Sequence, residues 1–356
     1  MIINWLLTRQ CNRHCPFCGL VNDSKCATYK TIKQVNENEL GFDSTIRTIE
    51  IMNKVYDKDK LFHIFYGGEP FVKEGFGKFM KKVNSMNINY TVITNSVLSD
   101  EVIKVFNYAG RYKGLTCSLD PIVMESNNAL NNIKNNAAMK LLELNKKHHL
   151  TDDMVVECVF DKKNMKYTKA FFEMMTEYYP EVSISISVYD LPKNIYYDFA
   201  ANPNADENYV NSMRILSDDK EWKNTIRIIK EGIDSGRYNV HMGKSKKFMD
   251  LIESACDSSY KCTPVYKNTN PTEFPTLTID ADGEFRLCLR IAGITRTFTK
   301  DVFVDDIETT KNNLHKLGII LQDNYDTYCK GCAWSCPMMD SCWDNESEVN
   351  HKQSTK

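Results

Sequence analysis

Residues 8–18 read TRQCNRHCPFC, and the rest of the chain is organised around this stretch. It contains Cys11, Cys15 and Cys18, spaced as Cys-x3-Cys-x2-Cys. Thiolates are soft ligands, and close groups of them hold zinc or iron–sulfur clusters. A structural zinc site needs four ligands, whereas a four-iron cubane held by three thiolates keeps one iron open for a substrate or cofactor. The spacing favours a 4Fe–4S cluster, with a zinc loop or unrelated buried thiols as alternatives.

Length and composition exclude several classes of protein. The chain has 356 residues, enough for two domains of about 100–200 residues each. Its 42% apolar and 26% charged residues are those of a globular protein. The net charge of −2 comes without a basic block, so nothing supports binding to nucleic acid. No run of about 18 apolar residues predicts a membrane span, and the N-terminus lacks the plan of a signal peptide.

The chain has thirteen cysteines and no export signal, which argues against a disulfide scaffold and for a reducing cytoplasm. Seven of them lie between Cys256 and Cys342, so they too indicate metal binding. Cys117 and Cys158 stand in apolar, strand-like runs, and we expect them to be small core residues. Cys26 has no assignment.

Strand-like and helix-like segments alternate over about the first 190 residues. The expected strands are 3–8, 61–66, 90–94, 115–119, 154–160 and 182–188. The expected helices are 40–57, 74–86, 99–109, the second half of 126–148, and 166–178. Six such units predict an α/β fold with parallel strands and right-handed crossovers, closed into a full or partial barrel. Chemistry is then expected at the carboxyl ends of the strands.

The later part of the chain has a different character. Helices are expected at 207–217, 219–235 and 244–256. Residues 276–287 predict a β-hairpin that turns at Asp282-Gly283, because Asp-Gly favours tight hairpin turns.

Polar and glycine-rich turns follow the second, third and fourth expected strands. They are Gly67-Gly68-Glu69-Pro70, Thr94-Asn95-Ser96 and Ser118-Leu119-Asp120. Two glycines allow a backbone to approach a ligand closely, and Glu69 offers a carboxylate to an ammonium group. Ordinary turns, with Glu69 as a helix cap, are the alternative.

Together these motifs resemble the radical S-adenosylmethionine (SAM) enzymes, whose fold is a partial (β/α)6 TIM-like barrel. The resemblance implies that Cys11, Cys15 and Cys18 hold a 4Fe–4S cluster beside the aromatic Phe17, and that the open iron takes the amino and carboxylate groups of SAM. It further implies SAM contacts from the remaining motif residues: Gly67, Gly68, Glu69, Pro70, Thr94, Asn95, Ser118 and Asp120. Pro121 departs from the family, where Gly often follows the Asp.

The second cysteine group resembles the SPASM extension, which carries auxiliary 4Fe–4S clusters. The implied ligands are Cys256, Cys262, Cys288, Cys329, Cys332, Cys336 and Cys342, with Gly283-x4-Cys288 as the Gly-x4-Cys element. A first auxiliary cluster would use Cys256, Cys262, Cys288 and Cys342. A second would have only Cys329, Cys332 and Cys336, with an open iron or a further ligand such as His351 or Asp340. One auxiliary cluster, or zinc, remains the alternative. The expected regions are a barrel at 1–190, a helical linker at 191–255, a SPASM-like domain at 256–345 and a polar tail at 346–356.

The resemblance implies an enzyme that cleaves SAM to a 5′-deoxyadenosyl radical and abstracts hydrogen from a peptide or protein side chain, with crosslinking or oxidation as the outcome. An external donor such as flavodoxin or ferredoxin would supply electrons. A radical enzyme acting on a small molecule or nucleotide is the first alternative, and a metal-binding scaffold without chemistry is the second.

Only ten residues precede Cys11, so we expect no fused leader-binding domain. No catalytic acid or base is assigned, since the residues expected near the mouth are equally good turn formers: Tyr189, Asp190, Asp280 and Asp282.

Overall fold

The computed structural model describes residues 1–13, 39–125, 136–188, 212–216, 218–241, 243–244, 246–254, 276–286 and 295–328. The strands are β1 (Ile2–Thr8), β2 (Phe62–Gly67), β3 (Asn89–Thr94), β4 (Gly114–Ser118), β5 (Asp153–Phe160), β6 (Ser183–Val188), β7 (Thr276–Ile279) and β8 (Phe285–Arg286). The α-helices are α3 (Phe42–Val55), α4 (Phe76–Ser85), α5 (Ser99–Ala109), α7 (Ala137–His148), α8 (Thr168–Tyr178), α10 (Lys220–Asp234), α11 (Lys246–Ser254), α12 (Thr299–Val302) and α13 (Ile307–Tyr328). Short 3-10 turns include η2 (Pro70–Val72) and η4 (Met165–Tyr167).

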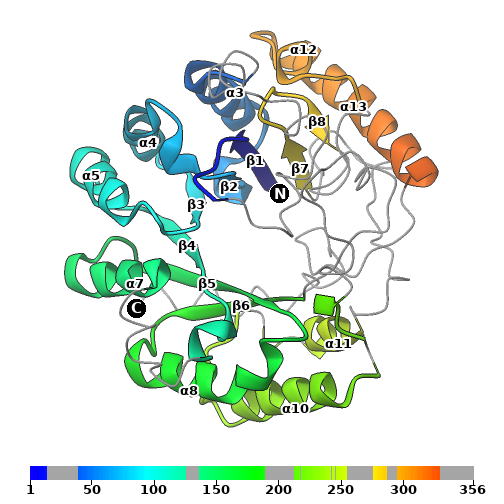
Figure 1. Ribbon diagram of the computed structural model, residues 1–356. Coiled ribbons are helices and arrows are strands. Elements are labelled where there is room, and N and C mark those ends of the chain that lie inside the picture. Colours follow the sequence, from blue (N-terminus) through cyan, green and yellow to red (C-terminus); the bar gives the residue numbers. More distant parts are fainter. Residues whose placement is uncertain are drawn as a thin grey trace.

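The strands form one curved sheet in the order β6-β5-β4-β3-β2-β1-β7-β8, and every neighbouring pair except β7–β8 is parallel. Figure 1 looks into the arc, with the helices from α3 to α8 along its outer side. This confirms the partial barrel that the strand–helix alternation predicted. Because parallel strands joined by crossovers all point the same way, the turns after β1 to β4 meet at one edge of the sheet.

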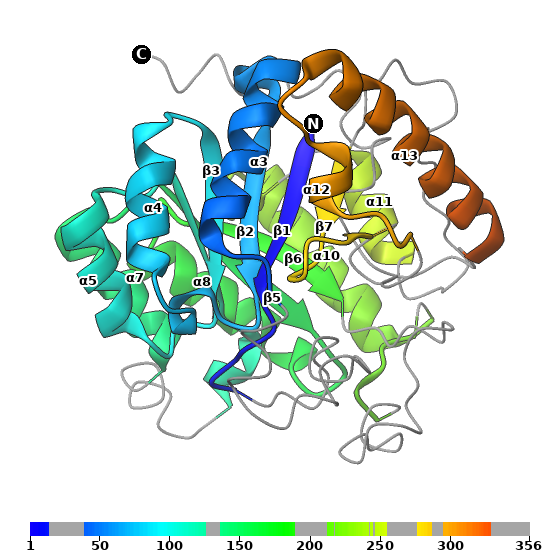
Figure 2. The ribbon, with the colours of Figure 1, turned by 90° about the horizontal axis from the view of Figure 1, so that it is seen from above.

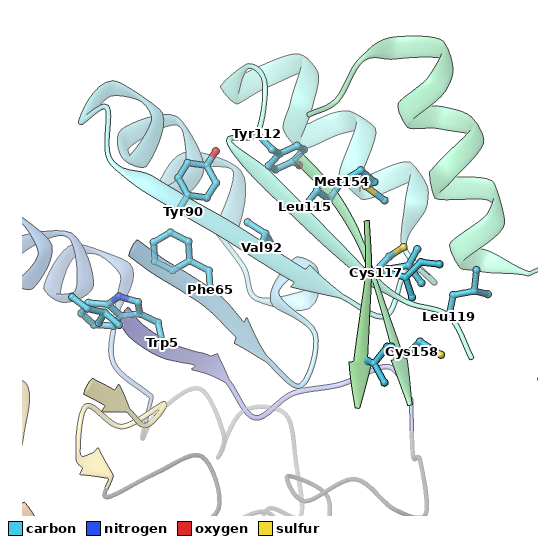
Figure 3. Packing of buried hydrophobic residues seen from close by; sticks show 14 of the residues in the cluster. Trp5, Phe65, Tyr90, Val92, Tyr112, Leu115, Cys117, Leu119, Met154 and Cys158 are labelled. Carbon is cyan, nitrogen blue, oxygen red and sulfur yellow. The ribbon is translucent and has the colours of Figure 1, made fainter. Parts of the chain in front are cut away.

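Apolar residues alternate along the strands, so one face of the sheet packs on the helices. On β5 the residues Met154, Val156, Cys158 and Phe160 are all buried and the intervening ones are half-buried. Figure 3 shows Met154 and Cys158 of β5 in this layer, together with labelled core residues of β1 to β4. Cys117 and Cys158 lie fully buried in this layer as free thiols, which confirms their prediction as core residues. Burial raises the pKa of Cys117 to about 12, so its thiol stays protonated.

The opposite face of the sheet is more polar. Thr91 and Thr116 alternate with the core residues of β3 and β4, and their hydroxyl oxygens lie 3.1 Å apart. Asn4 on β1 donates from Nδ2 to the hydroxyl of Thr276 on β7 over 3.1 Å. These buried polar groups therefore bond one another across neighbouring strands.

The hairpin at 276–286 forms as predicted, and it also joins the barrel. β7 pairs in parallel with β1, with Ile2 opposite Thr276, and β8 returns antiparallel to β7. Gly283 has φ +86°, as its place in the turn requires. This part of the expected 256–345 region therefore continues the sheet of the barrel.

Two features of the fold were not anticipated. Helix α13 covers the end of the sheet near α3, as Figure 2 shows. Its buried residues Leu314, Leu317 and Leu321 have the three-to-four-residue spacing of a helix, so the signal was present in the sequence. Residues 239–241 also run beside β6, where the Ile184 amide donates to the Asn239 carbonyl over 2.9 Å. They cover part of what would be an open strand edge.

Within the described residues, none of the helices is long and apolar enough to cross a bilayer.

Candidate active site

Cys11 lies three residues beyond the end of β1, at the edge where chemistry is expected. Its thiol is partly exposed, and its sulfur accepts a hydrogen bond from the Arg13 amide over 3.4 Å. The other members of the predicted cluster site, Cys15, Cys18 and the aromatic Phe17, lie outside the described residues. One predicted ligand is therefore placed, and its sulfur is accessible.

The turn after β2 packs directly against the chain that leads to Cys11. The Gly68 amide donates to the Thr8 carbonyl over 2.8 Å, and the Glu69 amide donates to the Gln10 carbonyl over 2.8 Å. A Cβ atom on Gly67 would lie 2.4 Å from the Thr8 oxygen, and one on Gly68 would lie 2.0 Å from the Gln10 oxygen. We predicted that these glycines make room for a ligand. The structure shows that they first make room for this chain's own backbone, which brings the turn against the base of the cysteine segment.

Glu69 has no exposed surface, and its carboxylate caps η2 by accepting from the Phe71 amide. It also accepts from the Thr94 hydroxyl at 2.9 and 3.0 Å and from the Asn95 amide at 2.8 Å. Burial raises the pKa of this carboxyl, while these hydrogen bonds and the charge of Arg13 act in the opposite direction. We predicted that the carboxylate would accept from the SAM ammonium. Its partners in the structure are groups of this chain, so its side chain holds the turns after β2 and β3 together.

The turn after β3 reaches the cysteine segment. The Asn95 side chain donates from Nδ2 to the Asn12 side-chain oxygen over 2.8 Å, and the same nitrogen lies 3.6 Å from the Cys11 sulfur. Asn95 also accepts from the Val97 amide over 3.0 Å, which orients its amide group. Ser96 adopts φ +66°, which is uncommon for a residue with a side chain. Thr94 and Asn95, predicted from sequence as site residues, therefore meet Glu69 and Cys11.

The predicted residues after β4 lie farther round the same edge. Ser118 is exposed at the end of its strand. Asp120 accepts from the Val159 amide over 2.8 Å. Burial raises the pKa of Asp120 to about 6, helped by the nearby charges of Asp161 and Glu157 and opposed by that hydrogen bond and by Arg13. This carboxyl is therefore partly protonated near neutral pH.

The two aspartates of the hairpin have different roles. Asp282 is a turn former, since its side chain accepts from the Glu284 amide over 3.1 Å. Asp280 is 1% exposed and pairs with the guanidinium groups of Arg9 and Arg286. Asp280 is therefore part of a buried ionic group, whereas the sequence placed it near the expected mouth and made it an equally good turn former.

The predicted auxiliary ligands all lie outside the described residues: Cys256, Cys262, Cys288, Cys329, Cys332, Cys336 and Cys342. The same is true of Asp340, His351, Tyr189 and Asp190. Within the described ranges, no three His, Cys, Asp or Glu side chains are grouped as a metal site.

Sequence reasoning missed two residues that border the cysteine segment, Glu39 and Lys73. Lys73 is the residue directly after η2. Its ammonium lies 3.4 Å from the Glu39 carboxylate, and both side chains are largely buried. They stand far apart in the sequence and belong to no motif, so only the fold reveals the pair. The sequence did contain a signal for Asp280 and Arg286, because these two residues flank the predicted hairpin turn.

The described residues fit an iron–sulfur cluster and SAM. The Cys11 thiol is partly exposed and approached by an amide donor, as expected of a cluster ligand. The glycine turn brings backbone polar groups to the same edge, beside the thiol.

Comparisons with known proteins agree with this geometry. Residues 5–175 match the model of the Radical SAM superfamily. The crystal structure of SuiB from Streptococcus suis bound to S-adenosylmethionine superposes with a TM-score of 0.53 at 14% identity, covering 86% of this chain and 66% of that chain. The structure of SuiB bound to the precursor peptide SuiA gives a TM-score of 0.53 at 12% identity, covering 88% of this chain and 66% of that chain.

At these identities the likeness shows a shared fold, and the chain spans just under two thirds of the length of SuiB. No curated protein matches the chain. The matched stretch contains Cys11, the Gly67–Pro70 turn and the turns after β3 and β4, all on one edge of a parallel sheet. Residues 5–175 are therefore similar to the radical SAM superfamily.

Proposed function

We propose that this protein is a radical SAM enzyme that abstracts a hydrogen atom from a peptide or protein side chain. The observation that carries the proposal is the meeting of Cys11, the Gly67–Pro70 turn and Asn95 at the carboxyl edge of the sheet. When bound, a 4Fe–4S cluster supplies the electron that splits SAM into methionine and a 5′-deoxyadenosyl radical.

This chain's own residues would bind and orient the reactants. Cys11, with Cys15 and Cys18, would hold the cluster. The backbone of the Gly67–Pro70 turn would face the methionine part of SAM, with Glu69 fixing that turn from behind through Thr94 and the Asn95 amide. Ser118, exposed after β4, and Asp120 would reach the ribose and carboxylate groups.

A peptide substrate is supported by two observations. The solved structures that share this fold include one described as bound to a precursor peptide. The cysteines from Cys256 to Cys342 also resemble an extension for auxiliary clusters, which can accept an electron from the substrate in an oxidation or crosslink. A thiol-rich chain of this kind fits a reducing cytoplasm, and an external flavodoxin or ferredoxin would deliver the electron.

Anaerobic reconstitution with iron, sulfide and SAM tests the proposal. We expect 5′-deoxyadenosine to form, and about twelve irons per chain for three clusters or about eight for two. Cys11→Ala should abolish 5′-deoxyadenosine formation and remove about four irons. Cys158→Ala, at a buried cysteine in the core, is the matched control and should retain both. Equal iron and equal SAM cleavage in the two variants would contradict the assignment.

A further inference from the structure

The chain at the end of β1, just before Cys11, contacts Glu39, which comes much later in the sequence. One carboxylate oxygen of Glu39 accepts from the Thr8 hydroxyl over 2.9 Å and from the Arg9 amide over 2.6 Å. Cys11, Cys15 and Cys18 all lie between these contacts in the sequence. Glu39 therefore joins the start and the end of the segment that carries the cysteine motif.

Lys73 connects both ends to the glycine turn. Its ammonium donates to the Leu7 carbonyl over 2.6 Å and to the Leu40 carbonyl over 2.9 Å. It also faces the second carboxylate oxygen of Glu39 at 3.4 Å. Lys73 is the residue directly after η2, which begins at Pro70. Its side chain therefore links three parts of the chain: β1, the backbone at Leu40 and the turn that precedes α4.

The side chains of this pair are 10% exposed for Lys73 and 2% exposed for Glu39. The two carbonyls accept hydrogen bonds from the ammonium, and the Glu39 carboxylate faces it as the partner of an ion pair. Burial lowers the pKa of Lys73, and the Glu39 carboxylate acts in the opposite direction. Because a buried charge without its partner is strongly unfavourable, these contacts stabilise one arrangement of the three segments and disfavour others.

The same arrangement fixes the approach to Cys11. The Gly68 and Glu69 amides bond the carbonyls of Thr8 and Gln10, so the end of β1 cannot shift without breaking contacts on both sides. The Lys73 ammonium donates a hydrogen bond to the carbonyl of Leu7, one residue before Thr8, where these backbone hydrogen bonds begin.

We propose that Glu39 and Lys73 form a clamp that holds residues 7–9 and residue 40, which lie on either side of the cysteine motif in the sequence, beside the Gly67–Pro70 turn. Both are positioning residues: neither is a metal ligand, and each acts through the backbone at residues 7–9 and 40. Their expected role toward the cluster rests on the proposed function, whereas the clamp itself rests on the contacts above.

Lys73→Met and Glu39→Gln test the clamp in the full-length chain. Without added metal, amide hydrogen exchange at residues 8–11 and 40–41 should become at least tenfold faster in both variants. After anaerobic reconstitution, the iron retained per chain should fall by at least half. Lys73→Arg keeps the charge and the hydrogen-bond donors. Its amide exchange and its iron content should therefore lie between those of Lys73→Met and those of the unmodified chain.

Lys82→Met is the matched control. Lys82 also pairs with a glutamate, Glu50 at 3.1 Å, but on the surface, with the two side chains 52% and 45% exposed. In Lys82→Met, amide hydrogen exchange at residues 8–11 and the iron content should equal those of the unmodified chain.

Unchanged exchange at residues 8–11 in both Lys73→Met and Glu39→Gln would overturn the clamp, and so would equal acceleration in Lys82→Met. If Lys73→Met does not fold, Glu39→Gln decides by the same readouts, because it removes a charge while keeping the size of the side chain. A chain that binds no iron in any variant would contradict the proposed function, and the exchange data would still decide the clamp.

Discussion

The carboxylate of Asp280 pairs with the guanidinium of Arg9 inside the protein, where the two side chains are 0% and 1% exposed. The same carboxylate oxygen accepts from Arg286 at Nε over 2.8 Å and at a terminal nitrogen over 2.6 Å. Arg9 stands two residues before Cys11, and Arg286 stands two residues before Cys288. One buried anion therefore joins the cysteine segment of the barrel to the hairpin that leads to the second cysteine group.

Asp280→Asn should destabilise the protein strongly, because it removes the negative charge that two buried guanidinium groups share. Breaking a buried ion pair from one side costs about 3–5 kcal/mol, so we expect a loss of about 3 kcal/mol in the free energy of unfolding. Urea unfolding followed by tryptophan fluorescence measures it. Asp305→Asn is the control, because Asp305 pairs with Arg47 on the surface, with side chains 84% and 61% exposed. Its effect should stay under about 1 kcal/mol. Similar losses in the two variants would show that the buried pair contributes no more than a surface pair.

Gly68→Ala should disrupt the base of the cysteine segment. The added Cβ would lie 2.0 Å from the Gln10 carbonyl oxygen, a backbone atom that cannot rotate away. We expect a loss of about 2 kcal/mol or more in stability, together with lower iron content. Gly77→Ala, in α4, is the matched change, since its Cβ would make only ordinary contacts at 3.7 Å with Val105 and Tyr108 of α5. It should stabilise the helix by about 0.5–1 kcal/mol. Thermal melts and iron analysis decide, and a Gly68→Ala variant as stable as the unmodified chain would rule out the close approach.

Glu69→Gln should weaken SAM binding by at least tenfold. The glutamine amide would place two protons where the carboxylate now accepts from Phe71, Thr94 and Asn95, so at least one of these donors loses its acceptor. The cost in stability should be about 1–2 kcal/mol. Equilibrium dialysis of reconstituted protein against labelled SAM measures the affinity. Glu50→Gln, on the exposed face of α3, should bind SAM normally. Normal affinity in Glu69→Gln would mean that its carboxylate does not orient the turn.

Asp120 should make stability depend on pH. Burial raises its pKa in the folded chain to about 6, against about 3.9 in an unfolded chain. The folded chain therefore holds the proton more tightly. This contribution to stability is fully present below about pH 4 and is lost as the pH rises to about 6.

Asp120→Asn should remove this dependence, since asparagine keeps an oxygen for the Val159 amide and does not ionise. Relative to the unmodified chain, the variant should gain about 2 kcal/mol between pH 4 and pH 7. Urea unfolding of the metal-free chain at several pH values shows the difference. A constant difference across this range would mean that Asp120 titrates normally.

Most of the barrel could be predicted because each strand and helix has its own local pattern. Period-two burial on β5 and three-to-four-residue spacing on α3 follow from where apolar side chains must face, and both are visible in the sequence. The motif residues Glu69 and Asn95 could be placed at one edge because parallel strands carry their ends together. Helix α13 had the same kind of signal, and it was missed.

Sequence by itself determined the parallel α/β order and the similarity of residues 5–175 to the radical SAM superfamily, since periodicity and motif spacing are local properties of the chain. Only the tertiary structure decided what the charged residues around Cys11 do. The partners of Glu39 and Lys73, and the Arg9 partner of Asp280, lie on segments distant in sequence. It is the folding of β1 between β2 and β7 that brings them together. A carboxylate or an ammonium has no periodic signature, so its role depends on which opposite charge the fold buries beside it.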